Sequence, residues 1–487
     1  MSTEAYLAPK PFPWWQTGQW ALAIAAAVVL GATTTIDPTA SAILAGALGL
    51  GLAASLRVAV VPAMLVLLAA FDSIIPQHTR FGDGIEAHQA HESLAAVLAL
   101  IVVLAELGLG RSRILLKSPT GWVKGRIGWV GAYVLWAVAS TLWTVSVEDS
   151  LQALWGLALI TGCLLAFAAL LSSRSDLRLL VSVVVLASLS VATYSIAAYA
   201  TGAEGSTLVG TSDTNGFGLH QVMLLPLVFV AATHAPTRWL RAAIYVAALV
   251  VIGSIFTSLS RGSVVALVVL VLAMLFAPTG TVFRSRAQRV IPVLIAGAVL
   301  ISATLLTNEF AERWVWNYEG EAAGSGRVNL WSIGVAVAYD RPVLGLGYGG
   351  FKPSSNELMR STPGVDLARF PLTGNGLRAH SAYVSTVSEL GLVGLALFLG
   401  LLIATAMALK RMARTAYETG DFFVSGVAYA LILTLVGWAI NSAFSAAEID
   451  FLLWAVFGLS LALPKLVPDG TRDGARPIGP RQPAVGV

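Results

Sequence analysis

The sequence predicts an all-α polytopic membrane protein with about 12–14 transmembrane helices and one large extracytoplasmic loop that contains short helices. Hydrophobic residues make up 57% of the 487 residues and charged residues only 11%, whereas a soluble domain carries about 25% charged residues. The mean hydropathy is +0.79, and many apolar runs approach the roughly 20 residues that cross a bilayer. This composition excludes a soluble enzyme, a disulfide scaffold and a disordered protein.

Apolar runs along the chain predict the individual spans. They lie near 19–36, 40–56, 58–75, 93–110, 127–145, 151–172, 178–201, 217–234, 240–258, 262–278, 290–307, 380–409, 422–445 and 450–464. The second and the last are short, so a re-entrant segment is an alternative interpretation for both.

The basic residues predict the topology. If the N-terminus is cytoplasmic, nearly all lysines and arginines outside residues 308–379 fall on the cytoplasmic side, and the exceptions are Arg80 and Arg261. We therefore expect both termini to be cytoplasmic. The expected segments are a cytoplasmic N-terminus (1–18), helices 1–11 (19–307), a large extracytoplasmic loop (308–379), helices 12–14 (380–464) and a disordered cytoplasmic tail (465–487).

The loop 308–379 is too long to be a bare connection, which indicates a functional segment. It contains a predicted helix over about Arg327–Tyr339, preceded by Ser325 and Gly326 and ended by Pro342.

Cationic residues begin several helices on the predicted outer face. Arg261 and Arg327 each open a helix, and Arg378 and His380 open the long helix after the loop. The helix dipole is positive at this end, so a cation there is unfavourable unless an anion is bound. Arginine offers bidentate geometry to phosphate oxygens, and the pattern therefore predicts a phosphate or diphosphate site. For each arginine alone, contact with lipid head groups is the alternative.

His380 is the candidate general base, because a histidine can take the proton of a hydroxyl as it attacks. A structural histidine is the alternative. Glu389 lies nine residues further along, on the opposite helix face, so it cannot orient His380 directly. As an intramembrane carboxylate it is a functional candidate, with a helix-to-helix hydrogen bond as the alternative.

Three other segments carry polar residues on the predicted outer face. The first outer loop contains Arg80, which can contribute to a phosphate or sugar site, and His88 and His91, which lack a defined zinc spacing. Asn215 precedes a span and can cap that helix. The glycine-rich stretch 344–351 predicts a flexible loop in which Tyr348 can stack on a sugar.

No cofactor is expected. The single cysteine, Cys163, excludes an intramolecular disulfide and a cysteine metal cluster, and we expect no metal site. The glycine-rich stretch lacks the Gly-Lys-Ser/Thr of a phosphate-binding loop. The net charge of +4 reflects topology, so nucleic acid is not an expected partner.

An ordered set of motifs resembles the O-antigen ligase and O-antigen polymerase superfamily of bacterial membrane glycosyltransferases. The motifs are Gly210–Asn215, Thr257–Ser263, Gly326–Trp331, Pro342–Phe351, Ala379–Tyr383 and Glu389–Gly394, with a weaker match upstream at Trp143–Gln152. The resemblance covers about 210–400.

The resemblance implies an inverting, metal-independent transferase of the GT-C type in the bacterial plasma membrane. Its donor would be a glycan on a polyprenyl diphosphate, and its acceptor a glycan, lipid or cell-wall hydroxyl. Arg261 and Arg327 would hold the diphosphate, Arg378 would be a third contact, and His380 would be the base. Asn215, Tyr348, Tyr383 and Glu389 are expected acceptor or sugar contacts. The family's usual His-Asn is here His380-Ser381, so position 381 receives no role.

The sequence leaves two alternatives open. A repeat-unit polymerase of the same superfamily cannot be separated from a ligase, because their substrates differ in ways that one chain does not show. A transporter or flippase of lipid-linked glycans would place charges or broken helices near the bilayer midplane. The span centres here are almost free of charge, with Glu389 the nearest exception, which favours a one-sided enzyme.

Overall fold

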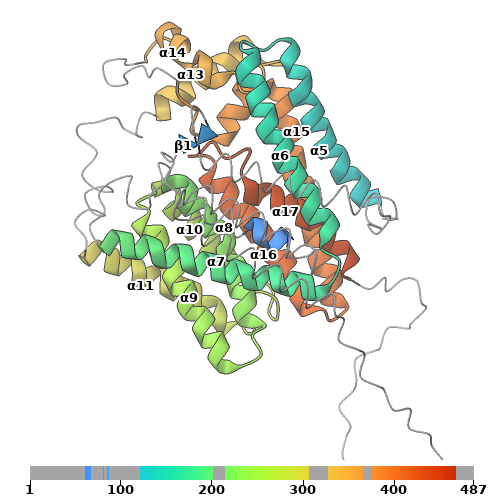
Figure 1. Cartoon of the computed structure of the whole chain (residues 1–487). Helices are drawn as coiled ribbons and strands as arrows, with labels where there is room; N and C mark the ends of the chain where they lie inside the picture. Colours follow the sequence, from blue (N-terminus) through green and yellow to red (C-terminus); the bar gives the residue numbers. More distant parts are fainter. Residues whose placement is uncertain are drawn as a thin grey trace, which may run out of the picture.

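The computed structural model describes residues 61–66, 80–81, 85–86, 121–200, 214–306, 327–365 and 376–467. The predicted spans near 19–36, 40–56 and 93–110, both terminal segments (1–18 and 468–487), and His88 and His91 lie outside the described residues. Helices dominate the described part (Figure 1). They are α5 (Gly121–Ala139), α6 (Val147–Leu170), α7 (Arg174–Ala200), α8 (Thr214–Thr233), α9 (Arg238–Thr257), α10 (Arg261–Met274), α11 (Ile291–Leu306), α13 (Arg327–Asp340), α14 (Phe351–Ser361), α15 (Ala382–Glu418), α16 (Phe422–Asn441) and α17 (Phe451–Ala462), with short 3-10 turns η1 (Ser140–Leu142), η3 (Ala287–Val290) and η5 (Leu463–Lys465).

These helices confirm the all-α polytopic membrane fold. Within the described residues, six helices are long and apolar enough to cross a membrane, namely α6, α7, α8, α9, α15 and α16. The predicted helix at Arg327–Tyr339 is confirmed as α13. The last predicted span, 450–464, corresponds to α17, whose 12 residues are too few to cross a bilayer alone. The β-sheet of the described part consists of two antiparallel strands of two residues each, β1 (Arg80–Phe81) and β2 (Ile85–Glu86).

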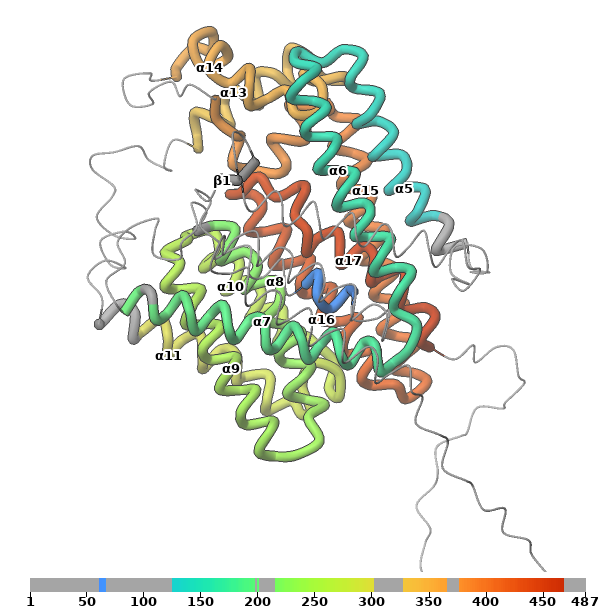
Figure 2. The backbone as a smooth tube through the Cα atoms, in the orientation of Figure 1, coloured from blue at the N-terminus to red at the C-terminus, as the bar shows by residue number. Residues whose placement is uncertain are grey.

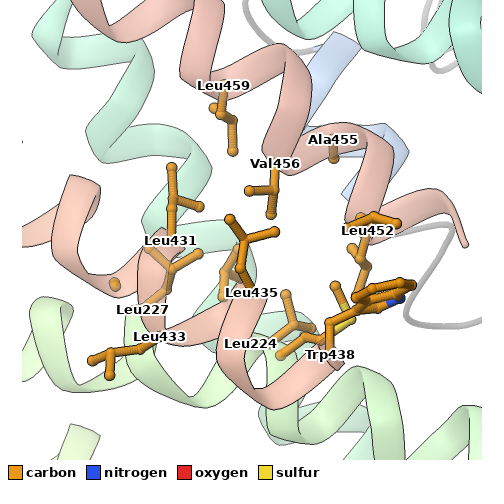
Figure 3. Close-up of a cluster of buried hydrophobic side chains, with 14 of the residues drawn as sticks. Leu224, Leu227, Leu431, Leu433, Leu435, Trp438, Leu452, Ala455, Val456 and Leu459 are labelled. Atoms are coloured by element: carbon orange, nitrogen blue, oxygen red, sulfur yellow. The ribbon is translucent and has the colours of Figure 1, made fainter. Parts of the chain in front are cut away.

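The centre of the fold is built by α8, α16 and α17. Leucines from all three helices, with Trp438 of α16, meet in one cluster (Figure 3). In a bilayer, helix contacts gain little from the hydrophobic effect, so close packing and interhelical hydrogen bonds hold them. Both are present: Gly437 of α16 lies against Val222 of α8, and the Thr434 hydroxyl donates to the Met223 carbonyl at 2.7 Å.

Local sequence sets where six of the described helices begin. A side-chain oxygen at the N-cap accepts a backbone N–H of the first turn, which satisfies one of the four N–H groups that the helix leaves free. The residues that do so precede α6, α9, α10, α15, α16 and α17, and they are Ser146, Thr237, Ser260, Ser381, Asp421 and Asp450.

The segments between helices gather at two opposite ends. The end that carries α13 and α14, at the top of Figure 1, is called the α13 end. There, Asn215 contacts Ser260 across α8 and α10. At the opposite end, Arg174 pairs with Asp421 at 2.7 Å. The described segments predicted to be extracytoplasmic share the α13 end, which agrees with the alternation of the predicted topology.

The long helix α15 is broken at Gly391, where the backbone takes φ 66° and ψ −171°. The carbonyl of Pro342 fills the break and accepts a hydrogen bond from the Leu392 N–H at 2.7 Å. A Cβ at position 391 would lie 2.1 Å from the carbonyl oxygen of Val343, so only glycine fits. The predicted span near 380–409 falls within α15, but the break divides it: a short helix, 382–390, precedes the membrane-length part of α15.

Candidate functional site

The candidate site lies at the α13 end, around the loop that joins α16 to α17 (442–450). The first helical N–H of α15, at Ala382, donates to the carbonyl oxygens of Ser442 and Ser445, both at 2.9 Å. His380 lies two residues before this contact. The loop between α16 and α17 therefore supports the segment that carries the predicted base.

The same loop also touches the starts of α10 and α13. The ring of Phe444 packs against the ring of Trp331, one turn along α13 from Arg327, with 6.1 Å between the ring centroids. A Cβ on Gly262, the residue after Arg261, would lie 3.1 Å from the Cβ of Phe444. One aromatic side chain thus joins the helix starts that carry Arg261 and Arg327.

The predicted cations lie at or just before three helix starts, each of which contacts the loop between α16 and α17. Arg261 is the first residue of α10 and is exposed, and Arg327 is the first residue of α13 and is half-buried. Arg378 and His380 are exposed, but they precede α15, which begins at Ala382. The prediction that these two residues open the helix is therefore displaced by a few positions, because Ser381 serves as the N-cap.

Backbone strain is concentrated in this region. In the described part of the chain, two residues other than glycine have positive φ: Leu259 at 53° and His380 at 49°. Leu259 lies two residues before Arg261. A left-handed backbone is unfavourable for residues with a Cβ, and such strain clusters at functional sites, where the surrounding structure holds it.

The segment before His380 is anchored by a small second core. Ala379 is fully buried in a cluster with Leu330 of α13 and Phe351 and Met359 of α14. The tube in Figure 2 shows α13 and α14 beside the start of α15. Two residues earlier, the Leu377 N–H donates to the Ser355 hydroxyl of α14 at 2.7 Å. The burial of Ala379 thereby fixes the backbone that carries the exposed side chain of His380.

Asn215 lies in the first turn of α8, and its side chain joins a polar chain of hydrogen bonds between helices. Its Oδ1 accepts from the hydroxyl of Ser260, the N-cap of α10, at 2.8 Å. The Ser263 hydroxyl donates to Ser260 at 2.9 Å and accepts from Asn441 Nδ2 of α16 at 2.8 Å. This chain fixes the turn before Arg261 relative to α8 and α16.

Glu389 binds the glycine-rich loop and the start of α14. Its Oε2 accepts from the Gly349 N–H at 2.8 Å, and its Oε1 accepts from the Phe351 N–H at 3.2 Å. Phe351 is the first residue of α14, so the carboxylate lies at the positive end of that helix dipole. These bonds link α15 to the loop and α14, rather than to another membrane-spanning helix.

The glycine-rich loop is packed, contrary to the prediction of a flexible loop. It lies against the α5–α6 connection, which carries the weak upstream motif: the Val145 N–H donates to the Leu346 carbonyl at 3.0 Å, and Ser150 donates to the Tyr348 carbonyl at 2.5 Å. Gly347, at φ 87°, approaches Thr144 so closely that a Cβ would lie 2.5 Å from its Cα. The glycines therefore serve close packing as well as the turn.

The two predicted tyrosine contacts are partly or fully enclosed. Tyr348 is 3% exposed and belongs to the main core, so a sugar contact there would require the loop to move. Burial also raises the pKa of its hydroxyl well above the usual value. The Tyr383 hydroxyl donates to the Ala439 carbonyl of α16 at 2.8 Å, and its ring packs edge-on against Trp438. Sugar contacts by Tyr348, Tyr383, Asn215 and Glu389 stay predictions.

Comparison with known families supplies an independent finding. A family model described as O-antigen ligase matches residues 246–399. The resemblance to the O-antigen ligases is confirmed. A search of curated proteins finds no match to the chain.

The O-antigen ligase match begins within α9 and ends within α15, so it contains Arg261, Arg327, Arg378 and His380. The loop between α16 and α17, to which all three helix starts attach, lies beyond it. The catalytic candidates therefore come from the matched region, and their mutual placement depends on a segment outside the match.

Sequence reasoning missed the acidic residues of this loop. Burial raises the pKa of the Glu448 carboxyl to about 7, although Arg378 and Ser385 act to lower it. Glu448 Oε2 is buried without a hydrogen-bond partner among the described residues. Asp450 Oδ2 lies 2.7 Å from His220 Nε2 and so ties α17 to α8. The sequence did carry a signal for these residues, because Glu448 and Asp450 are two acidic residues in a short connection between apolar runs.

The described residues contain no group of three or more histidine, cysteine or acidic side chains placed to hold a metal. Arg80 lies in β1, opposite Glu86 of β2. Its role at a phosphate site stays a prediction.

Proposed function

We propose that this chain transfers a glycan from a polyprenyl-diphosphate donor to an acceptor hydroxyl on the extracytoplasmic face of the bacterial plasma membrane. The family match supports a glycosyltransferase of the O-antigen ligase and polymerase type in general. The observation that carries the finer proposal is the attachment of three cation-bearing helix starts to one loop, beside a strained and exposed His380.

The proposed step follows from these groups. His380 takes the proton of the acceptor hydroxyl while the hydroxyl oxygen attacks the anomeric carbon of the donor sugar. The bond from that carbon to the diphosphate oxygen breaks, with inversion. The electron pair leaves on the polyprenyl diphosphate, and Arg261, Arg327 and Arg378 stabilise its charge, together with the free N–H groups of the helix starts. No cofactor enters the step, because the activated donor supplies the energy.

The test is the lipid-linked and surface glycan profile of the native host carrying His380→Ala at wild-type protein level. His234→Ala is the control, because this histidine lies at the opposite end, where it contacts the Thr281 carbonyl. We expect His380→Ala to accumulate lipid-linked glycan and to lose the mature glycan, and His234→Ala to change neither. Long accumulated chains indicate a ligase and single repeats a polymerase.

A second pair of variants tests whether an arginine at the candidate site is needed for glycan transfer. We expect Arg261→Ala to reduce transfer on the order of 100-fold or more, as does loss of one preorganised donor to a developing oxyanion. Arg286→Ala, an exposed arginine at the opposite end, should leave transfer unchanged. If both glycan pools stay normal in His380→Ala and Arg261→Ala, the transferase proposal fails and a transporter of lipid-linked glycans becomes the better interpretation.

A further inference from the structure

A polar cleft lies at the end opposite to the candidate site, between three turns. Its volume is about 570 Å³, and it is lined by the α8–α9 turn, the α10–α11 connection and the α15–α16 turn. Ligand pockets in proteins have volumes of roughly 300–1,000 Å³, so this cleft has room for a head group or a small anion. It is separate from the glycan-transfer site proposed above.

The lining of the cleft is cationic. It includes Arg241 and Arg284 and no aspartate or glutamate. Two acids stand next to lining residues along the chain, and both are engaged: Asp421 is paired with Arg174 and caps α16, and Glu418 is paired with Arg414, each pair at 2.7 Å. Burial lowers the pKa of His234, another lining residue, which therefore stays neutral. The two arginines thus leave a net positive charge in the cleft.

Arg241 is positioned as a phosphate ligand. It stands in the first turn of α9, a cation at the positive end of the helix dipole, as at the candidate site. Its Nε is buried without a hydrogen-bond partner among the described residues, and its Nη2 makes only a 3.5 Å contact to the Ala235 carbonyl. Because Arg241 also lines the cleft, its guanidinium can offer donors there to the oxygens of a phosphate.

Neighbouring aromatic side chains place the cleft at the level of lipid head groups. Trp239, beside the cleft on α9, is 74% exposed, and Phe276, just after α10, is 85% exposed. The guanidinium of Arg238 lies 5.2 Å from the Trp239 ring centroid. Exposed tryptophan next to arginine is typical of a membrane interface, and basic pockets between helices on the cytoplasmic side bind anionic head groups.

We propose that this cleft binds a phosphate group, carried either by an anionic lipid head group or by a soluble phosphate compound. Arg241 and Arg284 contact the phosphate oxygens. The Thr279 hydroxyl and the Tyr417 phenol, which also line the cleft, donate to the rest of the ligand. Under the predicted topology this site faces the cytoplasm.

The test is titration of the purified full-length protein with phosphatidylglycerol, with phosphatidylcholine as the neutral control, followed by native mass spectrometry. We expect selective binding of phosphatidylglycerol, weakened roughly fivefold by Arg284→Gln, since one basic residue near a membrane surface contributes about that factor. Arg286→Gln is the matched control: it is exposed on the same connection, lies outside the cleft lining, and should change the affinity less than twofold.

Arg284 is exposed, so its substitution should preserve folding, and Arg241→Lys adds a variant that keeps the charge but loses the fork of donors. Inorganic phosphate is then added as a competitor. Displacement of the lipid indicates that soluble phosphates share the site, and its absence assigns the site to the lipid head group. Equal loss in Arg284→Gln and Arg286→Gln, or no binding of either probe, would overturn the proposal. Because glycan transfer is measured separately, neither result bears on the transferase proposal.

Discussion

Replacing Gly391 with alanine should disrupt the break in α15 and, through it, the candidate site. The backbone at Gly391 has φ 66° and ψ −171°, a region that only glycine occupies readily. An alanine Cβ would also lie 2.1 Å from the Val343 carbonyl oxygen. The loop that carries Val343 must then move away from α15.

The cost has two parts. Holding alanine in this backbone region costs about 1–3 kcal/mol. Moving the loop weakens two hydrogen bonds, from Leu392 N–H to Pro342 at 2.7 Å and from Leu346 N–H to Ser388 at 2.9 Å, each worth about 0.5–1.5 kcal/mol. We therefore expect a destabilisation of about 2–6 kcal/mol.

The assay is the midpoint of thermal unfolding of the purified protein in one detergent, with glycan transfer measured at equal protein level. Gly297→Ala is the matched control, because Gly297 lies inside α11 and a Cβ there meets nothing within 4 Å. Alanine at that position should be neutral or stabilise the helix by up to about 1 kcal/mol. If the two variants unfold at the same midpoint, the proposed role of the break is refuted.

Three further substitutions test the surroundings of the site. Glu448→Gln should flatten the pH dependence of stability. The folded carboxyl, with a pKa of about 7, keeps a proton that the unfolded chain loses above about pH 4.5, so wild-type stability should fall by up to about 3 kcal/mol as the pH rises from 5 to 8. An equally steep fall in the variant contradicts this. Ser260→Ala removes the N-cap of α10, and Thr237→Ala removes that of α9. Both should destabilise the protein by about 0.5–2 kcal/mol, but only Ser260→Ala should lower glycan transfer. Equal transfer in both variants argues against a role for the turn before α10. Phe444→Ala removes the ring pair with Trp331, which is worth about 0.5–1.5 kcal/mol. Glycan transfer by this variant should fall by more than its small loss of stability explains. Unchanged transfer would show that Phe444 does not place the helix starts.

In the described part of the chain, the membrane-length helices α6, α7, α8, α9 and α16 followed from the sequence with small boundary errors, because apolar length is a local property that the bilayer selects directly. The run predicted at 151–172 is α6, and the run at 217–234 is α8. The helix within the large loop was also predictable, since Gly326 and Pro342 bound it. Helix α14 was not predicted. The N–H of its first residue, Phe351, donates to the carboxylate of Glu389, which is distant in sequence.

Several site features were not visible in the sequence for the same reason. The break at Gly391 depends on the Pro342 carbonyl, and the rigid glycine-rich loop depends on the α5–α6 connection. The positive φ of His380 depends on the burial of Ala379 beside it. Each is a contact between segments that no local pattern joins.

The sequence by itself determined the membrane class, the order of the described spans and the candidate residues Arg261, Arg327, Arg378 and His380. Hydropathy and charge act residue by residue on the environment, so a linear pattern suffices to reveal them. Only the tertiary structure decided that the helix starts beside these residues attach to one loop between α16 and α17. That arrangement depends on the packing of helices far apart in the chain, and packing is a property of shapes that meet, which a single sequence does not display.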